Sequence, residues 1–453
     1  MADEVPEHGR GERAENTTEP DTADRLARTA IRGPKLWLAP VLVVSLLMSV
    51  LAAVYMGGIL DPKKSLHDFP IALVVSDEGD VLPTGEQANF GNQIRDGLVA
   101  GIDPNTVDLR QMGIAQAHDE LDSGEVFGAI VIPSDFTKRL SILAEASVVA
   151  GDVDKPVITV YTNPRAGTLG SSLFSAIGDQ ALGEANTKVG QQLTESVQAQ
   201  LAAGQSMSGA AALTLADPID IIVTPHDPLP DGTGLGLSAF YYALLLLLAG
   251  FTGAMVVSAL VDSVLGFTPT EFGPFFRHTR AAPISRLQTM FVKWALMAIL
   301  GVVVSALYLW ISTALGMPSS HSLLLWMYGA LAITAVGVTA VSIVSVFGTL
   351  GLLINLILFV VLGLPSAGAT VPISAAPRLF GWLAQFEPMH QVYLAVRAIL
   401  YFDARWDAGL GHGVTATLIG TAIGLVFGFV VVRFYDRKGF ERRDGTLVTS
   451  RES

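Results

Sequence analysis

Residues 235–261 read Leu-Gly-Leu-Ser-Ala-Phe-Tyr-Tyr-Ala-Leu-Leu-Leu-Leu-Leu-Ala-Gly-Phe-Thr-Gly-Ala-Met-Val-Val-Ser-Ala-Leu-Val, without a single charged side chain. A hydrocarbon core about 30 Å thick is crossed by roughly 20 apolar residues in a helix. The stretch therefore predicts a transmembrane helix. Comparable runs occupy residues 37–59, 287–315, 323–346, 347–364 and 414–432, so the sequence predicts six spans. One helix over 323–364 would be too long for a single crossing, and we expect a tight turn with Gly348 and Gly351 as the breakers.

The composition agrees with a membrane protein and excludes several other classes. Hydrophobic residues make up 51 % of the chain and charged residues 15 %, where a soluble chain would carry about a quarter. Without cysteine there is no disulfide and no thiolate metal site. No phosphate-binding loop motif occurs, so any ATPase is expected to be a separate polypeptide. We therefore expect neither an enzyme nor a bound cofactor.

Charge is distributed unevenly along the chain. Residues 60–233 hold 24 acidic and 9 basic side chains, a net of −15, so the rest of the chain is slightly basic. A polyanionic domain is unsuited to nucleic acid, whose phosphates require Lys and Arg. Basic residues cluster beside the predicted spans, and Lys and Arg mark the cytoplasmic side. With six spans all three clusters lie on that side: Arg25, Arg28, Arg32 and Lys35; Arg277, Arg280 and Arg286; Arg433, Arg437, Lys438, Arg442 and Arg443.

These observations predict a multi-pass protein of the cytoplasmic (inner) membrane with both termini inside. We divide it into a disordered cytoplasmic tail (1–35), the first transmembrane helix (36–59), an extracytoplasmic α/β domain with a long helix (60–233), helices two to six (234–433) and a cytoplasmic tail (434–453). Within the outer domain, strands are predicted at 71–75, 107–112, 127–132, 157–161 and 219–223. A long helix over 168–201 either packs on its own sheet, which we favour, or projects as a stalk.

Several segments of the outer domain resemble a known family. They are Ile71-Ala-Leu-Val-Val-Ser-Asp-Glu-Gly79, Gly91-Asn-Gln-Ile94, the run from Leu121 through Phe136, and Val157-Ile-Thr-Val-Tyr-Thr-Asn163. This succession resembles the YhgE/Pip (phage infection protein) family and the related EsaA and nitrosoguanidine-resistance (Sng-like) membrane proteins. The resemblance implies an ABC type-2 permease-like membrane part with six helices and an irregular segment between the fifth and sixth.

Three segments of the membrane part are candidate functional elements. The loop 262–286 combines aromatic and basic residues; it is either a membrane-interface anchor or, as the resemblance implies, a coupling element for an ATPase (Phe272, Phe275, Phe276, Arg277, Arg280 and Arg286). The segment 365–411 is either a re-entrant pair open to the outer leaflet or an amphipathic surface helix (Pro377, Trp382, Glu387, Pro388 and Arg397). Small residues recur every four positions in the last helix and predict close packing, within the chain or across a homodimer (Ala416, Gly420, Gly424 and Gly428).

Isolated polar groups receive simpler interpretations. His226 and Asp227 form either a metal or acid–base pair or, as we favour, part of a Pro-rich linker. Asp77, Glu78, Asp80 and Glu86 lack the spacing of a calcium loop and are expected to be solvated turn residues. Lys293 is expected to extend toward the membrane surface.

Two functions follow from these expectations. The first is a permease subunit, in a homodimer within the lipid bilayer, that exports a hydrophobic or amphipathic substrate or envelope component and is energised by a separate ATPase. The alternative is a non-transporting envelope scaffold or secretion-system accessory protein with a surface-exposed, phage-receptor-like domain.

Overall fold

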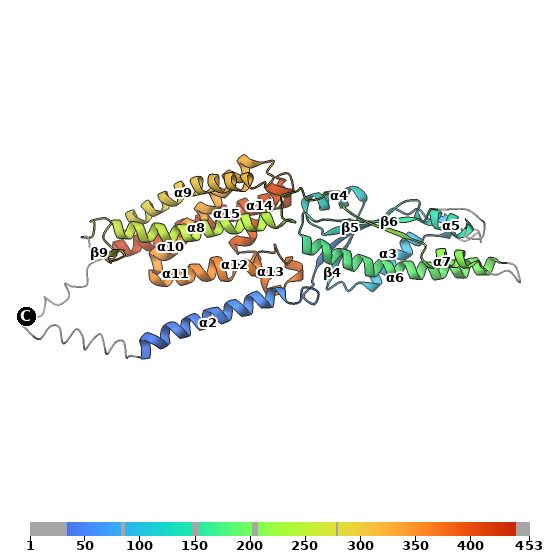
Figure 1. The fold of residues 1–453 in the computed structure, drawn as a ribbon, viewed down its shortest axis with the longest axis horizontal. Coiled ribbons are helices and arrows are strands. Elements are labelled where there is room, and N and C mark those ends of the chain that lie inside the picture. Colours follow the sequence, from blue (N-terminus) through green and yellow to red (C-terminus); the bar gives the residue numbers. More distant parts are fainter. Residues whose placement is uncertain (1–33, 83–86, 147–153, 202–206, 278–279, 441–453) are drawn as a thin grey trace, which may run out of the picture. The chain divides into compact units, whose positions relative to one another are not determined.

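The computed structural model describes residues 34–82, 87–146, 154–201, 207–277 and 280–440. The chain divides into two compact units, one ending at Met56 and one beginning at Gly57. All described residues of the first unit belong to helix α2 (Pro34–Ile59), whose last three residues fall in the second unit (Figure 1). Only 6 % of its apolar window Val41–Gly58 is buried. Such an apolar, exposed helix is stable in lipid but not in water.

A five-stranded sheet is formed by the part of the chain that follows α2 and precedes α8. Its strands are β1 (Phe69–Val75), β4 (Val107–Gln111), β5 (Gly128–Ile132), β6 (Val157–Thr162) and β7 (Asp220–Pro225), in the order β4-β1-β5-β6-β7. Neighbouring strands are parallel except β5 and β6. All five overlap the predicted strands, because short runs of β-branched residues between turns are a reliable strand signal.

Helices and one small ribbon surround this sheet. They are α3 (Phe90–Gly101), α4 (Ile114–Ser123), α5 (Phe136–Ala146), α6 (Thr168–Gln200), α7 (Gly209–Ala216) and the ribbon of β2 (Asp80–Val81) and β3 (Gln87–Ala88). Val189, Leu193 and Val197 of α6 are buried at the spacing of one helix face. This burial favours a helix packed on its own domain over a projecting stalk. We refer to residues 69–225 as the sheet domain.

Asp77 holds the carboxyl end of β1 to two helices. Its carboxylate accepts hydrogen bonds from the backbone N–H groups of Gly91 (2.9 Å) and Thr137 (3.0 Å) and from the Thr137 hydroxyl (2.5 Å). The Asp77 side chain is therefore buried and saturated, and the expectation of a solvated turn residue was wrong for it. The fourth residue of that group, Glu86, lies outside the described residues.

The membrane part is a bundle of long helices. It consists of α8 (Leu237–Val264), α9 (Arg286–Ala314), α10 (Ser322–Phe347), α11 (Thr349–Leu356), which continues through a π-helical turn (Ile357–Val361) into α12 (Gly363–Ser366), and α15 (Gly411–Arg437), which follows a second π-helical turn (Trp406–Leu410). With α2, six helices of the described chain are long and apolar enough to span a membrane. The protein is a polytopic membrane protein, and the number of helices long enough to span equals the predicted six.

The turn between the fourth and fifth spans lies where the sequence places it, but its two glycines differ in role. Gly348 ends α10 with φ +61°, a conformation that favours glycine. Gly351 lies inside α11, where a Cβ would come within 2.7 Å of the Ile343 carbonyl oxygen. Gly351 is therefore a close-packing residue and not a breaker.

Shorter elements connect the long helices. A 3₁₀ turn (Ile373–Ala375), α13 (Arg378–Ala384) and α14 (Pro388–Tyr401) lie between the fifth and sixth spans, and a hairpin of β8 (Thr270–Phe272) and β9 (Phe275–Arg277) lies between the second and third (Figure 1). We call the end of the bundle at Leu237, Ser322 and Gly411 the sheet end. The opposite end, at Val264, Phe347 and Arg437, is the hairpin end.

Candidate functional site

The bundle contains an apolar cavity between α10, α14 and α15. Its volume is about 400 Å³, in the range of small-molecule sites. The lining is formed largely by small and aliphatic side chains: Ala332, Ala335, Val336, Thr339, Leu358, Phe359, Gln385, Phe386, Pro388, Gln391, Val392, Ala416, Thr417, Ile419, Gly420 and Ile423. The space is open because most of the residues of α10 and α15 that face it have small side chains.

A second, wider cavity adjoins the first and shares Gln385, Phe386, Gln391, Ala416 and Ile419 with it. Its volume is about 970 Å³, and its remaining lining includes Trp406, Asp407 and His412. The two cavities form one groove, which we call the α14 groove. It is apolar at the end near Val336 and carries titratable side chains at the end near Trp406, as an amphipathic ligand would require.

Helix α14 begins deep in the bundle and ends at the sheet end. Pro388 and Gln391 line the same cavity as Ala332 and Thr339, which lie about 15 and 25 Å along α10 from its start at 1.5 Å per residue. At the other end of α14, the Tyr401 hydroxyl donates to the Gly236 carbonyl (3.1 Å) and accepts from the N–H of Ala239. The start of α14 is therefore near the middle of the bundle.

Glu387 fixes the start of α14. One carboxylate oxygen accepts from the backbone N–H groups of Met389 (2.6 Å) and His390 (3.2 Å), and Pro388 occupies the first turn, where its missing N–H has no cost. The Glu387 side chain is 3 % exposed, and its other oxygen, Oε1, has no hydrogen-bond partner. Glu387 therefore caps α14 and is not itself part of the groove lining.

Gln391 lines both cavities and also retains an unused acceptor. Its Nε2 donates to the Ala384 carbonyl at 3.0 Å, while its buried Oε1 has no partner. An unpaired buried acceptor costs about 1–3 kcal/mol. A hydroxyl or ammonium group in the groove would remove this cost at Gln391.

Other residues of the segment 365–411 hold it to neighbouring elements or face outward. Pro377 precedes α13 as its N-cap, and the Trp382 side chain is 59 % exposed. Arg397 donates from Nη1 to the Ala166 carbonyl (3.0 Å) and lies over the Phe402 ring at 5.2 Å. Arg397 therefore joins α14 to the loop after β6.

The four small residues of α15 do not act as one seam. A Cβ on Gly424 would lie 2.5 Å from Thr339 Oγ1, and one on Gly428 would lie 2.5 Å from Ser342 Oγ, so both glycines pack on α10 of the same chain. A Cβ on Gly420 would have no neighbour within 4 Å. Ala416 and Gly420 line the groove instead.

The candidate coupling loop forms a hairpin that sequence reasoning did not predict. Gly273, at φ +56°, and Pro274 make the turn between β8, which ends at Phe272, and β9. The Phe275 and Phe276 side chains are 76 % and 67 % exposed. The adjoining Arg277 and Arg280 are also exposed.

Two residues expected at the membrane surface have other roles. Arg286 is the first residue of α9 and donates from Nε to the Phe440 carbonyl at 2.7 Å, so it fixes the C-terminal end of α15. Lys293 does not extend to the surface. Its Nζ lies 2.9 Å from an Asp262 carboxylate oxygen, and its side chain is buried between α8 and α9. Pairing with Asp262 removes the need for snorkelling.

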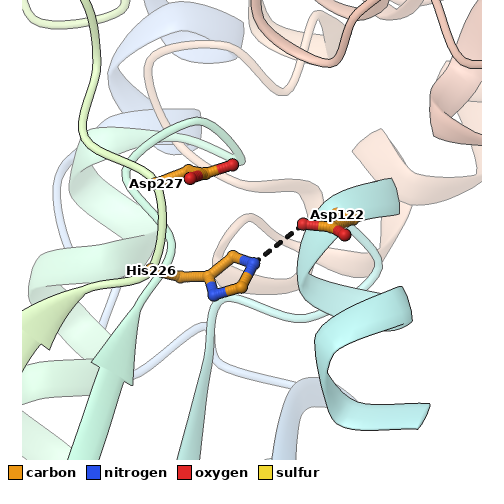
Figure 2. A group of neighbouring side chains, drawn as sticks. All are labelled: Asp122, His226 and Asp227. Carbon is orange, nitrogen blue, oxygen red and sulfur yellow. Dashed lines mark hydrogen bonds and ion pairs between the residues drawn. The ribbon is translucent and has the colours of Figure 1, made fainter. Parts of the chain in front are cut away.

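Where the sheet domain meets the linker to α8, three titratable side chains converge. In the view of Figure 2, the carboxylates of Asp122 and Asp227 both lie above the His226 ring. His226 Nε2 lies 2.8 Å from Asp122 Oδ1. One ligand atom from each of the three residues lies within 4.8 Å of the others. Asp122 comes from α4, 104 positions before His226, and local sequence patterns could not indicate that approach.

The fold and site define a polytopic membrane protein with a sheet domain between its first two spans and a groove within its bundle. Residues 40–433 match the model of the family described as "Protein of unknown function (DUF3533)", and the chain belongs to that family. No curated protein and no solved structure matches the chain.

Proposed function

We propose that the chain is the permease subunit of an ABC type-2-like exporter, which moves a hydrophobic or amphipathic molecule or envelope component out of the cytoplasm. The α14 groove carries this proposal. It joins an apolar space of about 400 Å³ to a wider one with His412 and Asp407 in its lining. A molecule with an acyl-like part and a polar head matches both parts.

A buried acceptor narrows the class of cargo. Gln391 lines both cavities and its Oε1 lacks a donor, so a complementary molecule would bring a hydrogen-bond donor to this depth. A hydroxyl-bearing or amine-bearing amphiphile meets this requirement better than a plain hydrocarbon. The depth of Pro388 and the exposed Trp382 support a re-entrant pair of α13 and α14 that opens toward lipid.

The orientation is also part of the proposal. The basic residues near the hairpin end, including Arg277 and Arg437, favour placing that end in the cytoplasm of a cell with the protein in its inner membrane. A cysteine introduced at Glu271 should then be protected from a membrane-impermeant thiol reagent on whole cells. A cysteine at the exposed Thr187 of α6 should react, and the reverse pattern would contradict the orientation.

ATP hydrolysis by a separate subunit would be coupled to transport at the β8–β9 hairpin. Two exposed phenylalanines beside Arg277 form a compact aromatic–basic surface of the kind that carries binding energy in protein interfaces. We propose that this surface binds a separate ATPase subunit. As the family resemblance implies, two copies of the chain would form the transport pathway.

The coupling proposal is tested by Phe275→Ala with Arg277→Ala. Loss of an aromatic anchor and its charge should weaken ATPase association by about 2 kcal/mol or more, roughly 30-fold. Dansyl-labelled dodecylamine, an amphiphile whose sulfonamide N–H is a hydrogen-bond donor, serves as the probe, and its efflux from expressing cells should fall to the level of cells without the protein.

The matched control is Phe434→Ala with Lys438→Ala. This pair also combines an exposed aromatic ring with a cation, 5.7 Å apart, at the same end of the bundle. The control should keep both ATPase association and efflux. If no ATPase co-purifies with the wild type and the probe is not exported, the exporter proposal fails and the envelope scaffold becomes the better account.

A further inference from the structure

We propose that Asp122, His226 and Asp227 form a binding site for one Zn²⁺ ion at the edge of the sheet domain. One imidazole nitrogen and two carboxylate oxygens within 4.8 Å of one another make the donor set. Zn²⁺ accepts this mixed set and completes its tetrahedron with water. The imidazole argues against Ca²⁺ and Mg²⁺, which prefer oxygen ligands.

The geometry requires side-chain rotation. In a tetrahedral site, two donor atoms that each lie about 2.1 Å from the ion are about 3.4 Å apart, so the widest separation, at most 4.8 Å, has to shrink by up to about 1.4 Å. The 2.8 Å between Asp122 Oδ1 and His226 Nε2 has to widen by about 0.6 Å. The Asp227 side chain is 49 % exposed, which leaves space for its rotation toward them. Figure 2 shows its carboxylate on the side of the His226 ring that faces Asp122.

Two arginines support the carboxylates without occupying both oxygens of either one. Arg165 Nη1 lies 2.9 Å from Asp227 Oδ2, and Arg405 Nη1 lies 3.8 Å from Asp122 Oδ2. Asp122 Oδ1 faces the histidine, and Asp227 Oδ1 remains for an ion. Carboxylates that bind metals commonly accept a second hydrogen bond that fixes their orientation, as Asp227 does from Arg165.

An independent observation points to the same place. Among the described residues of the sheet domain, the side chains with a buried and unpartnered polar atom are His118 (Nε2) and Arg165 (Nε). His118 precedes Asp122 by one helical turn of α4, and its ring centroid lies 5.2 Å from that of His226. Unsatisfied polar atoms in this domain thus gather around the proposed site, as expected where a ligand would complete the arrangement.

Zinc at this position would connect elements that are distant in sequence. Asp122 ends α4, whereas His226 and Asp227 follow β7 directly and precede Pro228 on the way to α8. Arg405 belongs to the segment between α14 and α15. The ion would therefore tie the last strand of the sheet to α4 beside the bundle.

The test is equilibrium dialysis of the full chain in detergent against Zn²⁺, with Co²⁺ absorbance as a second readout of tetrahedral coordination. The wild type should bind one ion per chain. His226→Ala and Asp227→Asn should each weaken binding by about tenfold or more. Because Asp227→Asn changes a half-exposed position, it keeps the test decisive if the histidine variant does not fold.

Two controls separate metal ligation from ion pairing. Arg165→Gln removes the ion pair of Asp227 but keeps all three ligands, and it should retain one Zn²⁺ within a few-fold of wild-type affinity. His321→Ala disrupts another histidine–aspartate pair, with Asp403 at 3.5 Å, and should bind like the wild type. The proposal is overturned if the wild type binds no more Zn²⁺ than His226→Ala, or if Arg165→Gln and Asp227→Asn lose affinity equally.

Discussion

The buried carboxylate and amide side chains of the sheet domain are satisfied differently from those of the bundle. In the sheet domain, Asp77 accepts from Gly91 and Thr137, and Asn163 donates to the carbonyls of Leu121 and Val126 while accepting from Ala166. In the bundle, the buried side chains of Asn355, Glu387 and Gln391 each keep an oxygen without a donor.

This difference separates groups that stabilise the fold from groups available to a ligand. A saturated buried carboxylate contributes to stability and has no capacity left for binding. A buried acceptor without a donor lowers the stability of the protein when no ligand is bound, and this cost is removed when a ligand supplies a donor. The bundle, with Gln391 lining the groove, is therefore the part of the molecule we expect to bind cargo.

The largest effect should come from Asp77→Ala. The change leaves the buried N–H groups of Gly91 and Thr137 without acceptors, and each loss costs about 1–3 kcal/mol. We expect the sheet domain to lose about 3 kcal/mol or more, measured as a fall in thermal unfolding temperature. Asp80→Ala is the control, because the Asp80 side chain accepts a hydrogen bond from the adjacent N–H of Val81 in an exposed setting. If both changes lowered the unfolding temperature equally, the saturated hydrogen bonds of Asp77 would not be what stabilises the sheet domain.

An intermediate effect is expected in α15, where two glycines four residues apart differ. Gly424→Leu should destabilise the bundle by about 1–3 kcal/mol, because its Cβ would lie 3.0 Å from the Cα of Thr339. Gly420→Leu should change stability little, since no atom lies within 4 Å of its Cβ. Melting curves in detergent measure both variants. A cross-linked homodimer lost in Gly424→Leu while the monomer stays folded would instead place this seam between two copies.

The smallest effect on stability should come from Gln391→Leu. This change removes one hydrogen bond to Ala384 but also removes an unpaired buried acceptor, so the two contributions nearly cancel, to within about 1 kcal/mol. Binding of dansyl-labelled dodecylamine should nevertheless weaken. If Gln391→Leu unfolds the bundle as readily as Asp77→Ala unfolds the sheet domain, Gln391 belongs to the fold and not to the site.

Local patterns predicted the repetitive elements well. Continuous apolar runs gave the six long helices, and β-branched runs between turns gave β1, β4, β5, β6 and β7. Gly273 and Pro274, between phenylalanines, are typical turn residues and could have predicted the β8–β9 hairpin. The roles of Asp77 and of the Lys293–Asp262 pair were misjudged, because burial of a polar side chain depends on distant partners.

The candidate sites depend on contacts that no local pattern encodes. Asp122 and His226 are far apart in sequence, and the groove depends on α10, α14 and α15 meeting around small residues. The periodicity of α15 predicted close packing at all four small positions. It could not distinguish Gly424, which meets Thr339, from Gly420, which meets open space.

The account is tested most directly by filling the α14 groove. Gly420→Phe should place a ring in the cavity without a clash at its Cβ, while Leu418→Phe adds a ring at a 52 % exposed position of the same helix outside the groove lining. Binding of dansyl-labelled dodecylamine to the purified protein is measured by its fluorescence. The account predicts at least about tenfold weaker binding for Gly420→Phe and wild-type binding for Leu418→Phe, with both variants folded. Unchanged binding by folded Gly420→Phe would contradict the groove as the cargo site.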